Sequence, residues 1–388
     1  MSVTGPEGFR AAGVACGIKA RGVLDLALVA TAEPRPAAAV FTVNRAAAAP
    51  VRLSRMHLSS GRGVSAVLLN SGCANAGTGA AGAAAARASA AAVAGHLGGV
   101  AAEVLVASTG PIGPQLPIDM VLDGIGHAVA GLSSSPEAGH EAAEAIMTTD
   151  TVRKEAFVTT DGGYSVGGMA KGAGMIRPDM ATMLVVLTTD AAAPADLLDQ
   201  ALRAAVDETF HAVNIDGCAS TNDTVILLSS GTTGVVPTLE DLTAALTDVT
   251  ADLAHQLVAD AEGAERVVTI EVSGAVDDAA ARRAGRTIAD SALVRASFFG
   301  GDPNWGRLLG ALGASDVEFD PALVAVAYQG IVVARDGVGV PYDEPDLLDR
   351  MTEGPFTVEI TIGAGPGTAR VLTTDLTPDY VRLNGERS

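Results

Sequence analysis

The segment 171–187 constrains the fold of this chain more than any other stretch. A lysine and two glycines lead into a proline-stiffened turn, and residues 183–187 then form an unbroken apolar run. Glycine permits backbone conformations that other residues resist, so this turn can bend sharply or let a ligand approach closely. A short apolar run bounded by turn residues indicates a buried strand. Thr182 therefore lies where a tight turn meets a rigid element, which suits a reactive hydroxyl as well as an ordinary loop before a core strand.

The other residues favour helices packed closely on sheets. Hydrophobic residues make up 48% of the 388 residues but aromatic residues only 3%, so the core must consist of small and aliphatic side chains. This length provides a large core, in two domains or in one extended α/β unit. The net charge of -20 argues against nucleic acid as a partner, because neutralising phosphates requires clustered Lys and Arg side chains.

Cysteine usage and hydropathy indicate a cytoplasmic protein without a metal site. Cys16, Cys73 and Cys218 are far apart in the sequence, as expected for reduced thiols rather than a disulfide framework. No Cys/His cluster has the spacing of metal ligands. The N-terminus lacks an apolar signal core. The alanine-rich stretch 80–94 is interrupted by glycine, arginine and serine, so it is expected to be a packed helix rather than a membrane span.

Apolar runs between turn residues predict strands, and longer periodic stretches predict helices. The expected strands are 24–30, 37–43, 64–69, 104–107, 183–187, 267–272, 324–328, 331–334 and 356–362. The expected helices are 80–94, 136–147, 195–210, 239–261 and 277–289. The sequence also predicts a hairpin turn at 161–163 and an N-cap at Thr238.

Two turns after predicted strands carry small and hydroxyl residues. One is the loop 70–79, which is either a simple strand-to-helix turn or a backbone-lined pocket wall. The other contains Ser108, Thr109 and Gly110. A hydroxyl beside a glycine after a strand can place an O–H and a backbone N–H side by side, an arrangement that stabilises an oxyanion. Turns of this composition are common, so this pattern predicts no function by itself.

The chain lacks the standard catalytic motifs. If Thr182 is a nucleophile, no such motif supplies its general base. No histidine belongs to a recognisable nucleophile–base motif, and Gly-x-Ser-x-Gly, Walker-type and dinucleotide-binding patterns are missing. Cleavage of the Ala181–Thr182 bond would free the α-amine of Thr182. A reference pKa of about 7.7–8.0 suits such an amine for proton abstraction at neutral pH. The glycine-rich turn can distort the scissile peptide and favour attack by the hydroxyl on the preceding carbonyl.

The segment 171–184 resembles the signature of the ornithine acetyltransferase family, the glutamate N-acetyltransferases of arginine biosynthesis. Members of this family cleave themselves before the threonine of an Ala-Thr pair. Further matching motifs follow one another at family-like spacing at 70–79, 108–110, 147–151, 220–224, 260–263 and 302–307. The resemblance implies the α-β-β-α-type sandwich shared with self-cleaving aminopeptidases, with a smaller C-terminal domain. It also implies an α chain 1–181, a β chain 182–388, and homo-oligomers of processed αβ units, heterotetramers or larger.

The resemblance also implies roles for individual residues. Thr182 is the nucleophile that attacks the acetyl carbonyl of N-acetylornithine, and Thr109 and Gly110 form the oxyanion hole. The residues that match substrate-binding positions are Thr148, Lys171, Thr182, Glu262, Asn384 and Ser388. Lys171 can pair with the carboxylate of an amino acid and Glu262 with a cationic group. Without the family, Lys171 would be interpreted as a solvated turn charge and Glu262 as a helix-end carboxylate.

The sequence departs from the family at two places. Pro111 follows Gly110 where an aliphatic residue is expected, and proline removes a backbone N–H from that turn. The chain ends with the stretch 384–388, which lacks the family's tyrosine and is one residue shorter. Ser388 therefore matches the family's terminal substrate contact less closely than the other residues match theirs. Because this end lies near the substrate in the family, the resemblance implies the acyl donor and acceptor less directly than it implies the acyl-transfer chemistry.

The sequence therefore predicts a self-processing acetyltransferase that works without a cofactor or metal. Its ping-pong cycle passes through an acetyl-Thr182 ester, with N-acetylornithine as donor and glutamate as acceptor. Acetyl-CoA as a second donor is left open, as is a paralogue with another acyl donor or acceptor. A hydrolase of the self-cleaving aminopeptidase type would carry serine at the cleavage site. A binding or scaffold protein would have lost Thr109, Gly110 or Thr182.

Overall fold

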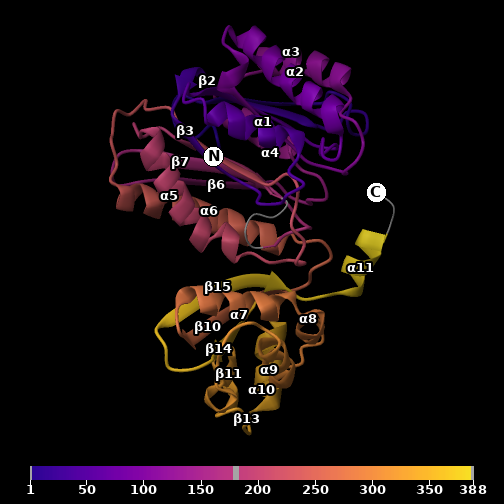
Figure 1. Ribbon diagram of the computed structural model, residues 1–388, viewed down its shortest axis with the longest axis vertical. Coiled ribbons are helices and arrows are strands. Elements are labelled where there is room, and N and C mark those ends of the chain that lie inside the picture. Colours follow the sequence, from indigo (N-terminus) through magenta and orange to yellow (C-terminus); the bar gives the residue numbers. More distant parts are fainter. Residues whose placement is uncertain (1, 178–182, 386–388) are drawn as a thin grey trace. The chain divides into compact units, whose positions relative to one another are not determined.

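The computed structural model describes residues 2–177 and 183–385 (Figure 1). The chain divides into two compact units. The first comprises Met1–His211 and Cys218–Leu257, and the second comprises Ala212–Gly217 and Val258–Ser388. Within the described ranges, no helix is long and apolar enough to cross a membrane.

The first unit contains two sheets and six α-helices in its described part. The first sheet has the order β1 (Arg10–Val14), β2 (Leu26–Arg35), β4 (Val64–Asn70) and β5 (Val104–Ser108). The second sheet has the order β3 (Ala37–Phe41), β9 (Thr224–Ser229), β8 (Leu184–Thr189), β7 (Ser165–Lys171) and β6 (Lys154–Thr159). The helices are α1 (Ala49–Leu58), α2 (Gly79–Leu97), α3 (Ile118–Ala130), α4 (Pro136–Ala145), α5 (Ala195–Glu208) and α6 (Leu239–Ala259).

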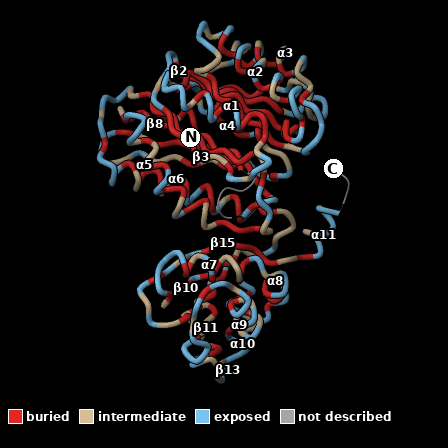
Figure 2. Tube along the Cα trace, viewed as in Figure 1, coloured by how far each residue is buried: buried red, intermediate tan, exposed pale blue. Residues whose placement is uncertain are grey.

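The side-chain alternation of the strands builds two cores on the two faces of the first sheet. Along β2, Ala27 and Val29 face a core that also contains Val186 and Ile226 of the second sheet. Their neighbours Leu26 and Leu28 face the opposite side, where α2 and α3 contribute their alanine and branched side chains. Successive strand residues point to opposite faces, so one apolar run serves both cores. Figure 2 shows these strands as buried and the outer faces of the helices as exposed.

The far face of the second sheet packs on α5 and α6. A Cβ on Gly168 of β7 would lie 2.7–3.2 Å from leucine and valine side chains, among them Val249 and Leu253 of α6. Glycine at this position lets the helix approach the strand closely. The layer order is therefore helices, sheet, sheet, helices. This confirms the α-β-β-α sandwich and the small-residue core predicted from the sequence.

The second unit is built on a six-stranded sheet of order β13-β12-β11-β14-β10-β15. Its strands are β10 (Val267–Ala275), β11 (Ala325–Tyr328), β12 (Ile331–Arg335), β13 (Val338–Gly339), β14 (Phe356–Thr361) and β15 (Gly367–Thr374). Its helices are α7 (Asp278–Asp290), α8 (Ala292–Phe299), α9 (Trp305–Gly313), α10 (Glu344–Thr352) and α11 (Pro378–Gly385). Helix α7 buries Ala284 and Ile288 in the same core as Val272 and Val358 of the sheet.

Most predicted elements are confirmed, with small shifts at their ends. The hairpin at 161–163 joins β6 and β7, and the Thr238 hydroxyl accepts the Asp241 N–H at 3.1 Å as the predicted N-cap. Strand β8 starts at Leu184 rather than at 183, because the Met183 N–H donates to the Asp223 carboxyl group. The predicted helix 136–147 ends at Ala145, where the chain turns toward Asp150.

Candidate active site

The ends of three strands position the residues that were predicted to be functional. In the first sheet, Asn70 at the end of β4 lies opposite Ser108 at the end of parallel β5. In the second sheet, Lys171 at the end of β7 lies opposite Leu184 at the start of β8. The hydrogen bonds below join these two sheet edges. The candidate site therefore lies where the two sheets of the first unit meet.

The turn Thr109–Gly110 is fixed by the backbone of the loop 72–74. The Cys73 N–H donates to the Thr109 carbonyl at 3.0 Å, and the Ala74 N–H donates to the Pro111 carbonyl at 3.2 Å. Gly110 has a φ of 135°, and a Cβ on it would lie only 2.5 Å from the Cys73 nitrogen. Only glycine fits this position. Pro111 is compatible with the turn because its carbonyl, not an N–H, makes the contact.

Two buried asparagines brace this turn from behind. Asn70 accepts the Ser108 hydroxyl through Oδ1 at 2.6 Å and donates to the Cys73 carbonyl at 2.9 Å. Asn222 donates from Nδ2 to the carbonyls of Ala74 and Ser108, at 2.6 and 2.8 Å. The loop 70–79 thus packs against the Thr109–Gly110 turn, as a pocket wall would. Asn222 ties the second sheet to that wall.

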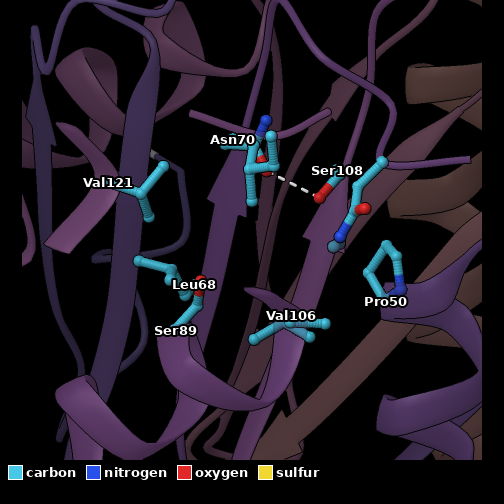
Figure 3. Close-up of a pocket in the computed structure, with 11 residues that line it drawn as sticks. Pro50, Leu68, Asn70, Ser89, Val106, Ser108 and Val121 are labelled. Carbon is cyan, nitrogen blue, oxygen red and sulfur yellow. Dashed lines mark hydrogen bonds between the residues drawn. The ribbon is translucent and has the colours of Figure 1, made fainter. Parts of the chain in front are cut away.

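A small cavity lies behind the turn, beside the Asn70–Ser108 hydrogen bond (Figure 3). Its lining is largely apolar and includes Leu68, Val106 and Val121. The volume open to the centre of a water molecule is about 10 Å³, so the cavity has room for about one water. The cavity is too small for an amino-acid substrate.

Lys171 contacts the predicted oxyanion turn directly. Its ammonium group is almost fully buried and donates to the Thr109 hydroxyl, with an Nζ–Oγ1 distance of 3.4 Å. A hydroxyl has one donor and two acceptor sites. Because Thr109 accepts from Lys171, its own O–H stays available to donate. No hydrogen bond of the described chain occupies the Gly110 N–H, so the turn offers two donors side by side.

Asp150 is the hub of the contacts around this lysine, because one carboxylate contacts two ammonium groups and two backbone N–H groups. It is buried, and its Oδ1 accepts the Gly172 N–H at 2.6 Å and the Lys154 ammonium at 2.7 Å. Its Oδ2 lies 3.9 Å from Lys171 Nζ and accepts the Thr148 N–H at 2.9 Å. Burial acts to raise the pKa of Asp150, but the two ammonium groups and the hydrogen bonds outweigh it and lower the pKa to about 2.

Thr109, Thr148 and Lys171 are therefore brought together, as the sequence predicts. The solvated-turn interpretation of Lys171 is wrong, because Lys171 is 2% exposed. A half-buried lysine adjoins the group: Lys19 donates from Nζ to the Met147 carbonyl at 2.6 Å, next to Thr148. Burial lowers the pKa of Lys19. The cluster is rich in cations, which suits a carboxylate-bearing substrate.

Two other predicted residues contact each other in the second unit. Asn384 on α11 donates from Nδ2 to Glu262 Oε2 at 2.9 Å, and also to the Tyr380 carbonyl at 3.1 Å. Glu262 lies just after the end of α6, as its helix-end interpretation requires. Ala181, Thr182 and Ser388 lie outside the described residues.

Comparison with known proteins identifies the family. The ArgJ family model matches residues 10–388. The arginine biosynthesis bifunctional protein ArgJ of Streptomyces avermitilis is 51% identical over 389 residues, with 100% of both chains covered. The chain belongs to the ArgJ family. The protein of the same name from Mycobacterium tuberculosis is 49% identical over 395 residues, covering 100% of this chain and 96% of that one. This ArgJ-family chain is thus an enzyme, and the non-enzymatic interpretation is wrong.

Two solved structures are also similar to this ArgJ-family chain. One is ornithine acetyltransferase complexed with ornithine from Mycobacterium tuberculosis, at 47% identity and a TM-score of 0.44; the match covers 47% of this chain and 96% of that one. The other is the aminopeptidase from Ochrobactrum anthropi described as a variant of the Ntn hydrolase fold. It is 12% identical with a TM-score of 0.41, covering 67% of this chain and 86% of that one.

Three residues at the candidate site of this ArgJ-family enzyme were not singled out from the sequence. They are Asp150, Asn222 and Asp223, each of which occurs in a motif that matches the family. Their roles depend on contacts with segments far away in the chain, which no local pattern reveals. The sequence feature that could have pointed to these three residues is the high density of polar residues directly before or after the apolar strands.

Proposed function

We propose that this enzyme moves the acetyl group of N-acetylornithine to glutamate. The observation that supports this most strongly is the Thr109–Gly110 turn, where a hydroxyl and a backbone N–H have no acceptor among the described residues and lie beside the buried Lys171 ammonium. Donors held in place before charge develops stabilise the oxyanion of an acyl-transfer reaction. The names of the relatives support the same reaction, since one is an ornithine acetyltransferase.

The proposed cycle begins with cleavage of the chain between Ala181 and Thr182. This yields an α chain 1–181 and a β chain 182–388. The Thr182 hydroxyl attacks the acetyl carbonyl, its α-amine takes the proton, and Thr109 and Gly110 hold the oxyanion. Ornithine leaves, and glutamate then attacks the acetyl-Thr182 ester through the same oxyanion hole. Lys171 pairs with the substrate carboxylate, and Glu262, Asn384 and Ser388 are proposed as further substrate contacts.

The reaction is tested with N-acetylornithine as donor. N-acetylglutamate is expected to form only when glutamate is present, and ornithine should appear in equal amount. Acetate release at the same rate without glutamate would instead indicate the hydrolase alternative. Replacing the donor by acetyl-CoA tests the bifunctional activity, and a panel of amines in place of glutamate tests for a paralogue with another acceptor.

Removing the Thr109 hydroxyl is expected to lower kcat strongly. The Thr109→Val variant keeps the branched shape but loses the donor, and losing one oxyanion-hole donor costs about 10²–10³ in kcat. The Thr109→Ser control keeps the hydroxyl and should retain most of the activity. Steady-state kinetics with N-acetylornithine and glutamate gives both values. Equal kcat values for Thr109→Val and the wild type would exclude the hydroxyl from the oxyanion hole.

A further inference from the structure

The lysines of this chain gather around one turn. Of the 25 lysine and arginine residues, only three are lysines: Lys19, Lys154 and Lys171. Lys154 and Lys171 lie beside the buried Asp150 carboxylate, at 2.7 and 3.9 Å. Lys19 donates from Nζ to the carbonyl of Met147, three residues before Asp150. Lysine and arginine differ in the shape and hydration of their charged groups. A chain that uses arginine at its other basic positions therefore indicates, by this concentration of lysines, a site that requires compact ammonium groups.

Lys19 differs from the other two lysines in its exposure and its partners. Lys154 and Lys171 are almost fully buried, whereas Lys19 is half-buried. Its ammonium group donates to two backbone carbonyls, those of Leu24 at 3.0 Å and Met147 at 2.6 Å. Across residues 2–177 and 183–385 it forms no ion pair, and the third of its N–H groups has no acceptor. Lys19 therefore has a charge and a donor available to a ligand.

The loop that carries Lys19 is fixed by a buried carboxylate. Asp25 is fully buried. Its two oxygens accept three backbone N–H groups at 2.6–3.0 Å, those of Cys16, Gly17 and Lys19. The Asp25 carbonyl accepts the Ser71 N–H at 2.9 Å, which ties this loop to the loop 70–79. Because the loop is held in place before a substrate arrives, little conformational freedom remains to be lost on binding.

The Lys19 side chain lies close to the proposed oxyanion turn. A Cβ on Gly72 would lie 3.0 Å from Lys19 Cγ, so the stem of the lysine packs against this glycine. A Cβ on Gly110 would lie 2.6 Å from the carbonyl carbon of the same Gly72. Gly72 therefore contacts both the lysine stem and the turn. The Lys171 ammonium reaches this turn from the second sheet, 3.4 Å from the Thr109 hydroxyl. Two lysines thus lie near the turn.

We propose that Lys19 binds the side-chain carboxylate of the acceptor glutamate and thereby selects glutamate over uncharged amino acids. This inference rests on the proposed function. N-acetylornithine has one carboxylate, which Lys171 is proposed to bind, whereas glutamate has two. A second carboxylate calls for a second cation. Lys154 does not qualify, because it is fully buried and lies 2.7 Å from Asp150. Among the described residues of this cluster, Lys19 is the lysine without a carboxylate of its own.

The charges of the cluster support this assignment. Burial lowers the pKa of Lys19, and the carboxylates of Asp25 and Asp150 act in the opposite direction. Lys171 also lowers the pKa of Lys19, because two nearby ammonium groups repel each other. A substrate carboxylate beside Lys19 accepts the remaining N–H and offsets this repulsion. Hydrogen bonds between oppositely charged groups are about twice as strong as neutral ones. Glutamate thus supplies the anion that Lys19 lacks.

The test compares the acceptor preference of three full-length variants with that of the wild type. With N-acetylornithine as donor, kcat/KM is measured for glutamate and for glutamine, which has nearly the same shape but no side-chain charge. In Lys19→Gln, whose amide can still donate to a backbone carbonyl, the preference for glutamate should fall about 10- to 100-fold, the usual effect of losing a hydrogen bond to a charged group. This loss should come from a higher KM for glutamate, while the KM for N-acetylornithine stays near the wild-type value.

Two control variants accompany Lys19→Gln. Lys19→Arg keeps the positive charge and should recover part of the preference for glutamate, although a guanidinium group differs in shape from an ammonium group. Arg21→Gln removes an exposed cation from the same loop. It should keep the wild-type preference, because screening by solvent and salt weakens the effect of an exposed charge.

The outcomes separate this inference from the proposed function. If the wild type transfers no acetyl group, the proposed function itself fails. If the wild type is active and Lys19→Gln still prefers glutamate over glutamine as strongly, Lys19 does not select the acceptor. An equal rise of KM for donor and acceptor would also overturn the inference, because it would place Lys19 at the carboxylate that both substrates share.

A measurement on the wild type decides if Lys19→Gln does not fold. N-acetylglutamate, the product of the proposed reaction, carries both carboxylates and no free amine. At saturating concentration it should slow the reductive methylation of Lys19, followed by peptide mass spectrometry. Methylation of Lys19 at an unchanged rate would overturn the inference.

Discussion

Replacing Asp150 by asparagine is expected to lower the free energy of unfolding by about 3–5 kcal/mol, the usual cost of removing one partner from a buried ion pair. The variant removes the buried carboxylate that lies 2.7 Å from the Lys154 ammonium group and 3.9 Å from that of Lys171. It also removes a partner of Gly172 and Thr148, because one amide oxygen cannot replace two carboxylate oxygens. Chemical denaturation at pH 7 measures the change.

The control for this variant is Asp199→Asn. Asp199 forms an exposed pair with Arg203 at 2.8 Å on α5, and exposed pairs contribute about 0–1 kcal/mol. A loss below about 1 kcal/mol in Asp150→Asn would contradict the hub role. Activity should fall as well, since Lys171 is no longer held toward Thr109.

The pH dependence of stability provides a second check on Asp150. Its pKa in the folded protein is about 2, below the ordinary value of 3.8. The folded state therefore binds fewer protons at this site than the unfolded state. The stabilisation by Asp150 is fully present above pH 3.8 and is lost as the pH falls toward 2. The difference in stability between wild type and Asp150→Asn should shrink over that range, and a constant difference would contradict the low pKa.

Replacing Thr182 by alanine is expected to abolish both cleavage and turnover. The variant has neither the hydroxyl that attacks the Ala181 carbonyl nor the oxygen that carries the acetyl group. Deleting a covalent nucleophile typically lowers kcat by about 10⁴-fold or more. Thr182→Ser keeps a hydroxyl and should retain cleavage and measurable turnover. Denaturing gels follow the first reaction and steady-state assays the second; a cut or active Thr182→Ala protein would exclude Thr182 from the corresponding role.

Local sequence patterns predicted those helices and strands whose limits depend on their own residues rather than on contacts with distant segments. The apolar run after Thr182 became β8, and Thr238 and Asp277 start α6 and α7 as N-caps. Helices α8, α9 and α10 were missed although side chains cap them, since each spans only eight or nine residues. Helices α1 and α3 were also missed, and their cap positions hold Ala48 and Pro117, which make no side-chain cap. The usual start signal of a helix is therefore missing from both.

The site was predictable only in part, for a related reason. Thr109 and Gly110 are adjacent in sequence, so their turn can be recognised locally. Asp150 and Asp223 depend on burial and on partners elsewhere in the chain: Asp150 contacts Lys171 and Gly172, which are 21 and 22 residues away, and Asp223 contacts Met183, 40 residues away. Whether a carboxyl group is solvated or buried decides its pKa, and the sequence alone does not reveal it.

The central claim is that cleavage frees Thr182 and that its hydroxyl carries the acetyl group. Intact-mass and peptide mass spectrometry of active protein, incubated with isotopically labelled N-acetylornithine without glutamate, tests both parts together. We predict two chains that meet at Ala181/Thr182, with one labelled acetyl group on the oxygen of Thr182 that disappears when glutamate is added. A single uncut chain in active protein, or a label on another residue, would contradict the account.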